Sequence, residues 1–219
     1  MLIDETFFNG LMNIPNIAEP EPNNRSANIL SELIDISEEE VLSLAFGMEM
    51  WDDFKENYQT DENYKKIVDG DTYQKDGKTH FWKGLVYGEY SNRSLLADYV
   101  YCRYHTHNVT QQTEFGQVAA DFKIGQKASS TPKITKAWNS FLTQFQGGRF
   151  NGGDGLTPEG NPYWIIPRRL GNGYGVSYYN GSQGGEVSLL QYLSDNKENF
   201  PLLQESRGFG LEFKNSFGI

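Results

Sequence analysis

The chain has 219 residues, of which 37% are hydrophobic and 14% are aromatic, and its formal net charge is −10 at pH 7. The aromatic content excludes a wholly disordered chain, and the acidic balance excludes binding of nucleic acid by general electrostatic attraction. A single cysteine, Cys102, excludes an intrachain disulfide framework and a multi-cysteine metal site. Because no basic-then-apolar leader and no run of 18 apolar residues occurs, we expect a soluble, non-secreted protein.

Charge and glycine are distributed unevenly along the chain. Residues 1–148 carry a net charge of −9 and residues 149–219 one of −1, whereas 13 of the 23 glycines lie in the last 71 residues. The change falls at Gly147-Gly148. We therefore predict an α+β protein whose mainly helical core has three to four helices, a β-hairpin and a long loop, followed by an extension with short strands. The predicted parts are an N-terminal arm (1–36), a helical core (37–148) and a glycine- and aromatic-rich C-terminal extension (149–219).

The N-terminal arm is predicted to be irregular at first, with a short helix at most towards its end. Pro15, Pro20 and Pro22 prevent a continuous helix or a central strand in this stretch. Phe7 and Phe8 are apolar enough to dock on another surface. That surface is either the core of the same chain or a neighbouring subunit, and the residues leave both readings open.

The clearest predicted helix covers residues 37–59. Ser37 followed by Glu40 forms a capping box at its start, and apolar residues then recur at three- and four-residue spacing. The opposite face is acidic and is expected to be exposed to solvent. Its acidic residues are Glu49, Asp52, Asp53 and Glu56.

Signals for a hairpin and two further helices follow. Asp76-Gly77 between two short β-prone runs predicts a tight hairpin turn. A largely buried aromatic helix is predicted over 92–108, and a third helix runs from Thr131 to Gly147. Between these helices, residues 109–130 show no sustained period and predict a long loop or a ribbon, and a long structureless loop is usually functional.

The C-terminal extension combines glycine with Tyr and Trp, which favours short strands and tight turns, followed by a short helix near residue 190 and a strand in the tail. Arg149, Arg168 and Arg169 are its basic cluster. These arginines either contact phosphates or an acidic partner, or they are surface residues at a turn. Candidate inter-subunit contacts from the arm, the loop and the extension are Phe7, Phe8, Phe115, Phe122, Arg149, Tyr163, Trp164, Arg168, Arg169, Phe209, Leu211, Phe213 and Phe217.

No catalytic, cofactor or metal site is expected from the sequence. His105 and His107 are two residues apart in a predicted helix, whereas helical metal ligands lie three or four apart. Cys102 has no accompanying nucleophile motif and is interpreted as a buried thiol. Asp69, Asp71 and Asp76 do not follow the spacing of a calcium-binding EF-hand loop.

Over residues 30–148 these elements follow a definite order. The order resembles the head-to-tail connector, or ring, proteins of tailed bacteriophages, most of all the collar ring proteins of crAss-like phages. The glycine-rich extension is not covered by the resemblance. The stretches that carry it are the acidic-capped helix, Asp69-Gly70-Asp71-Thr72-Tyr73, Gly84-Leu85, the aromatic helix Leu95–Tyr104, the Thr/Gly loop, and the Thr-Pro helix with Ala137-Trp138-Asn139.

The resemblance implies a non-enzymatic structural protein of the virion, made in the host cytoplasm. Such proteins form homo-oligomeric rings, commonly twelve-fold, which bind the portal and adjacent tail or collar rings and enclose the DNA channel. The genome would then be a passing cargo that is not specifically bound, with no cofactor and no membrane involved. An acidic lumen formed by Glu49, Asp52, Asp53 and Glu56 would repel that DNA.

Two other readings of the residues are kept. The Tyr- and Trp-rich extension is compatible with a carbohydrate-binding or adhesin-type module, although the three predicted helices argue against the all-β folds typical of such modules. An enzyme, for instance a hydrolase that uses Cys102 and His105, is the third reading, and no motif supports it.

Overall fold

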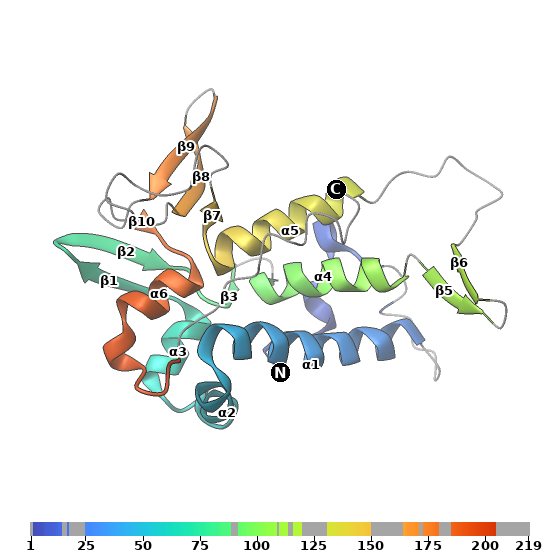
Figure 1. Cartoon of the computed structure of the whole chain (residues 1–219), viewed down its shortest axis with the longest axis horizontal. Helices are drawn as coiled ribbons and strands as arrows, with labels where there is room; N and C mark the ends of the chain where they lie inside the picture. Colours follow the sequence, from blue (N-terminus) through green and yellow to red (C-terminus); the bar gives the residue numbers. More distant parts are fainter. Residues whose placement is uncertain are drawn as a thin grey trace.

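The computed structural model describes residues 2–14, 17, 25–88, 92–108, 110–113, 116–119, 131–149, 164–170, 173–179 and 185–204. It is a mixed α+β structure, as predicted. Three long helices form its main layer: α1 (Arg25–Phe46), α4 (Leu95–Asn108) and α5 (Thr131–Phe145). In Figure 1 they lie side by side with α4 in the middle, and α4 contacts both of the others. Arg103 of α4 and Glu40 of α1 form an ion pair of 3.4 Å across this layer.

The first helix begins earlier than the sequence indicated. Ser37, predicted to cap a helix over 37–59, lies fully buried in the interior of α1. The apolar spacing that continues from Val41 extends upstream through Ile34 and Leu30, both buried, so the local capping signal is overridden by core packing. The arm is therefore shorter than predicted, because residues 25–36 of the stretch assigned to it belong to α1.

The same predicted helix is also interrupted by Gly47. This residue has φ +81° and ψ 161°, a conformation that is nearly restricted to glycine, and α2 (Met48–Asn57) begins immediately after it. A side chain here would also lie 2.7 Å from the Cβ of Gln204. The chain therefore turns a corner at Gly47, and α2 continues in a new direction into α3 (Glu62–Asp69).

The hairpin predicted at Asp76-Gly77 is confirmed. Strands β1 (Asp71–Lys75) and β2 (Lys78–Trp82) pair antiparallel, and both turn residues have positive φ, 51° and 71°, as a two-residue turn between twisted strands requires. Trp82 at the end of β2 is fully buried, and its indole Nε1 donates a hydrogen bond of 2.9 Å to the Ile67 carbonyl. A second small pair, β3 (Val86–Tyr87) with β4 (Arg93–Ser94), leads into α4.

Residues 185–204 return to the core, which the boundary at Gly147-Gly148 did not predict. Strand β10 (Gly185–Glu186) pairs parallel with β2, and Ser188 caps the following helix α6 (Leu189–Asp195) by accepting from the Gln191 N–H at 3.3 Å. A short 3-10 helix, η3, covers Lys197–Asn199. The side chains that this segment buries are Val187, Leu189, Tyr192, Leu193 and Phe200.

Two further groups of strands stand apart from this core. The stretch predicted as a long loop or a ribbon contains an antiparallel hairpin of β5 (Thr110–Thr113) and β6 (Gly116–Ala119), so the ribbon reading holds for these residues. Figure 1 shows this hairpin beyond the C-terminal end of α4, separated from the helical layer. The short strands predicted in the extension are present as β7 (Gly148–Arg149), β8 (Trp164–Leu170) and β9 (Gly173–Tyr179), paired in the order β7-β8-β9.

The N-terminal arm docks on its own chain. It contains two 3-10 helices, η1 (Glu5–Phe7) and η2 (Gly10–Met12), and both Phe7 and Phe8 are buried in the core cluster. Glu38, buried on α1, accepts hydrogen bonds from the N–H groups of Leu2 at 2.7 Å and Ile3 at 3.1 Å. Burial raises the pKa of the Glu38 carboxyl, and the two N–H bonds partly oppose that rise. Of the two readings of Phe7 and Phe8, docking on the same chain is the correct one.

We expect Glu38→Ala to release the arm, because two backbone N–H groups then lose their acceptor. The expected loss of stability is about 1.5 kcal/mol, measured by urea unfolding, with faster proteolytic cleavage before Ile14. Glu39→Ala, at an exposed neighbouring carboxylate, is the matched control. Equal cleavage rates for the two variants would show that Glu38 does not hold the arm.

Candidate functional site

The acidic residues predicted on α2 are only partly equivalent. Glu49, Asp52 and Glu56 are exposed. Asp53 is half-buried and accepts hydrogen bonds from the Tyr64 hydroxyl at 2.6 Å and the Asn57 amide at 2.8 Å. Asp53 therefore links α2 to α3 through its hydrogen bond with Tyr64, and its role is structural.

A second acidic row, which was not predicted, lies on α1. Glu32, Asp35 and Glu39 are exposed and recur at three- and four-residue spacing, so they share one helix face. Lys55 of α2 interacts electrostatically with both rows. Its hydrogen bond to Asp52 raises the pKa of Lys55 most, and the negative charges of Asp52, Glu39 and Glu56 raise that pKa further. We call this joint region the acidic surface, and its residues are Glu32, Asp35 and Glu39 of α1 with Glu49, Asp52 and Glu56 of α2.

Lys55 is the basic side chain placed within the acidic surface. Its Nζ lies 2.7 Å from the Asp52 carboxylate and 5.3 Å from the centre of the Trp51 ring. The exposed ion pair between Lys55 and Asp52 contributes little to the stability of the fold. The more important property of the acidic surface is therefore its negative electrostatic field. The region as a whole stays negative and repels other anions.

The predicted contact residues divide into three groups. Phe7 and Phe8 are buried in the core of this chain, so they do not offer a surface to a neighbour. A second group lies in β7 and β8 and consists of Arg149, Trp164, Arg168 and Arg169. In the strand register, Arg149 lies opposite Trp164 and Arg169 lies opposite Tyr174 of β9. The remaining candidates lie outside the described residues, and they are Phe115, Phe122, Tyr163, Phe209, Leu211, Phe213 and Phe217.

Cys102 and His105 occupy one face of α4 but do not form an activated pair. The Cys102 thiol is fully buried, its Sγ donates to the Ile134 carbonyl at 3.5 Å, and burial raises the pKa of the thiol. The His105 ring packs against Tyr101 and Tyr104, and burial lowers its pKa, with the charge of Lys133 adding to the effect. A nucleophilic cysteine requires a thiolate, which this environment disfavours.

Among the residues that the structure describes, no three His, Cys, Asp or Glu side chains gather where they could hold a metal ion. Within the same ranges, no helix has both the length and the apolar character needed to cross a bilayer.

Comparison of the chain with models of protein families, with curated proteins and with solved structures found no match. The case for a function therefore depends on the chain's own surfaces.

Proposed function

We propose that this chain is a structural subunit of a virion, which forms a homo-oligomeric ring at the head-to-tail interface of a tailed phage, binds the portal and neighbouring rings, and surrounds the DNA channel. The proposal starts from the order of motifs over residues 30–148. The observation that carries it further is a helical layer from which a separate β-hairpin, β5–β6, extends beyond the end of α4 (Figure 1). Ring closure needs one surface of a subunit to meet a different surface of the next copy.

The β5–β6 hairpin suits such a contact. Two antiparallel strands of four residues leave outer edges that can pair with a strand of another chain. An isolated two-stranded hairpin is at best marginally stable in water, so contact with a neighbouring copy would supply what the helical layer of its own chain does not. The arm does not serve this purpose, because Phe7 and Phe8 are used internally.

The acidic surface has a role in the same proposal. A ring repeats any surface charge around its axis, and a repeated negative surface facing the channel repels the phosphates of passing DNA. The residues that would line the channel are Glu49, Asp52 and Glu56, joined by the row on α1 that includes Glu39. Asp53, which bonds to Tyr64 and Asn57, would contribute less.

The test is the mass and shape of the purified full chain, alone and mixed with a phage portal complex. We expect closed rings in negative-stain images and a discrete multiple of 24.9 kDa in native mass spectra, with twelve copies expected from the resemblance. Replacing residues 110–119 by a glycine-serine linker should abolish the rings and leave a folded monomer with unchanged helical circular dichroism.

A control variant carries serine at the exposed residues Gln59 and Thr60 between α2 and α3, and it should form rings like the parent. If the parent chain stays monomeric with and without the portal complex, the proposed function is wrong. If rings form and the linker variant also forms them, the function stands and the hairpin is not the contact.

The carbohydrate-binding alternative gains no specific support from the described residues. Exposed aromatic rings are the platforms on which sugars stack, but Trp51 and Trp82 are buried and Trp138 is half-buried against Tyr99 and Phe141. These three rings are used in the core, whereas the alternative rests on the aromatic residues of the extension, of which Trp164, Tyr174, Tyr178 and Tyr179 lie in β8 and β9.

A further inference from the structure

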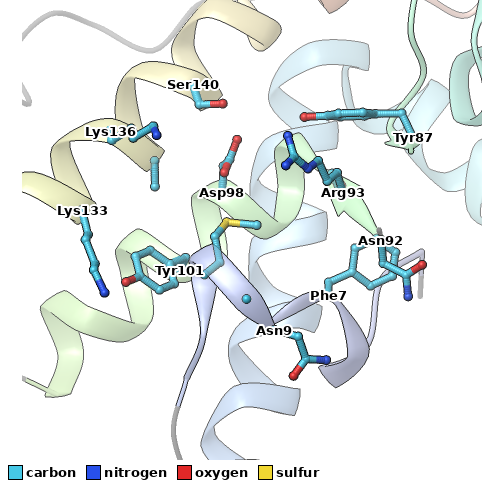
Figure 2. A pocket seen from close by; sticks show the side chains of 14 residues that line it. Phe7, Asn9, Tyr87, Asn92, Arg93, Asp98, Tyr101, Lys133, Lys136 and Ser140 are labelled. Atoms are coloured by element: carbon cyan, nitrogen blue, oxygen red, sulfur yellow. The ribbon is translucent and has the colours of Figure 1, made fainter. Parts of the chain in front are cut away.

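A cavity lies between the N-terminal arm, α4 and α5. Its volume is about 460 Å³, within the range of sites that enclose small organic molecules. The arm lines one wall with Phe7 and Met12, α4 lines the floor with Asp98 and Tyr101, and α5 lines the opposite wall (Figure 2). Three segments far apart in the sequence, residues 7–12, 87–101 and 133–140, meet here, so the cavity exists only in the folded chain.

The wall formed by α5 is cationic. Lys133 and Lys136 are three residues apart on one face of the helix, both are exposed, and both line the cavity. In the described part of the chain, neither lysine is within ion-pair distance of a carboxylate. Two lysines without a carboxylate partner among the described residues, both at the mouth of a cavity, are unusual in a chain with a net charge of −10.

The floor of the cavity carries a buried carboxylate with basic residues near it. Asp98 is buried on the floor, close enough to Arg93 and Lys83 for both to stabilise its charge, and it accepts a hydrogen bond from the Gln144 amide at 3.2 Å. The charges of Arg93 and Lys83 offset that of Asp98 only in part, and Figure 2 shows Arg93 across the cavity from the two lysines. The negative floor disfavours an anion bound deep inside, so an anionic group would bind at the lysines.

The inner surface between these charges is apolar and aromatic. Phe7 and Tyr101 are buried, Met12 is half-buried, and Ala137 adds a buried methyl group from α5. An apolar body placed against these side chains leaves water, while a charged head group attached to it reaches Lys133 and Lys136. The cavity thus combines an apolar interior with a cationic mouth.

We propose that this cavity binds a small amphipathic organic anion, with its phosphate, sulfonate or carboxylate head on Lys133 and Lys136 and its apolar or aromatic body against Phe7, Met12 and Tyr101. The proposal does not rest on ring formation, since it is argued from residues of the single chain alone. The two lysines select a ligand with a negatively charged head group, and the aromatic wall selects one with an apolar body.

The probe for the test is 8-anilinonaphthalene-1-sulfonate, an aromatic anion that fluoresces when its body leaves water. We expect saturable binding to the full chain, and Lys133→Gln with Lys136→Gln should weaken it about tenfold, since charge-assisted bonds are lost at both sites. The matched control, Lys65→Gln with Lys66→Gln, removes two exposed lysines from α3 and should bind like the parent. Thermal melting of each variant checks that the fold is retained.

Competition then separates the head group from the body. Phenyl phosphate should displace the probe at lower concentration than benzamidine, a cation of similar size, or inorganic phosphate, which lacks the apolar body. Equal weakening by the two lysine pairs would contradict the proposal, and so would displacement by benzamidine as effective as that by phenyl phosphate. Because binding is measured on the chain in any oligomeric state, a negative result here leaves the proposed ring untouched.

Discussion

Replacing Tyr192 by alanine is expected to cost about 4 kcal/mol of unfolding free energy, a large part of the stability of a domain of this size. Tyr192 is 1% exposed and lies at the centre of the contact between α6 and the β1–β2 hairpin. Its ring stacks on Trp82 at 6.0 Å and meets Tyr73 and Phe200 edge-on. Alanine would leave a cavity among these rings that the surrounding backbone cannot close. Urea unfolding followed by far-UV circular dichroism measures the effect.

Tyr192→Phe is the matched variant. It keeps the ring and removes only the hydroxyl, which donates to the Asp71 carboxylate at 3.1 Å, so we expect a loss of about 1 kcal/mol. A similar small loss for both substitutions would mean that residues 185–204 are not part of the cooperative core. A large loss for alanine alone would confirm that this segment folds together with residues 25–88.

Local signals predicted much of the fold. The Asp76-Gly77 turn, the end of α5 at Phe145 shortly before Gly147 and the aromatic helix that ends at Asn108 each depend on residues close together in the sequence. A turn needs two residues of suitable φ, and a helix end needs one glycine, so neither requires knowledge of the rest of the chain. These elements were therefore predicted close to their observed bounds.

Contacts between distant segments could not be predicted in this way. The start of α1 is set by burial of Leu30 and Ile34, and the capping signal at Ser37 carries no information about that burial. Parallel pairing of Glu186 with Phe81 joins strands about a hundred residues apart, and no local pattern specifies it. The glycine-rich composition of 149–184 suggested a boundary, and although the short helix near residue 190 was predicted, no local pattern indicated that it packs against the β1–β2 hairpin.

The acidic surface and the cavity likewise contain features that local sequence patterns predict and features that they do not. The acidic side of α2 was predicted because its period is local, while the row on α1 was missed because Glu39 was assigned to a helix start. The cavity was missed altogether, since it brings Phe7, Asp98 and Lys133 together from three separate segments. Asp98 offered no sequence signal beyond its place on an otherwise aromatic helix.

Asp98 provides the second large effect, a dependence of stability on pH. Burial raises the pKa of this carboxyl from 3.8 to about 6, while hydrogen bonds from Ser140 and Gln144 and the charges of Lys83 and Arg93 oppose the rise. The folded chain therefore binds this proton more tightly than the unfolded chain does. The resulting stabilisation is complete below about pH 3.8 and is lost as the pH rises through about 6.

Asp98→Asn removes this titration and leaves an amide that can still accept from Gln144. The unfolding free energy of the variant relative to the parent should therefore fall by about 2 kcal/mol between pH 7.5 and pH 4.5, since one pKa unit is worth about 1.4 kcal/mol. Glu49→Gln, at an exposed carboxyl, is the control for the loss of one negative charge. A difference between Asp98→Asn and the parent that does not change over this pH range would mean that Asp98 is ionised as readily in the folded chain as in the unfolded one. The carboxylate would then be solvated, and the floor of the cavity would be open to water.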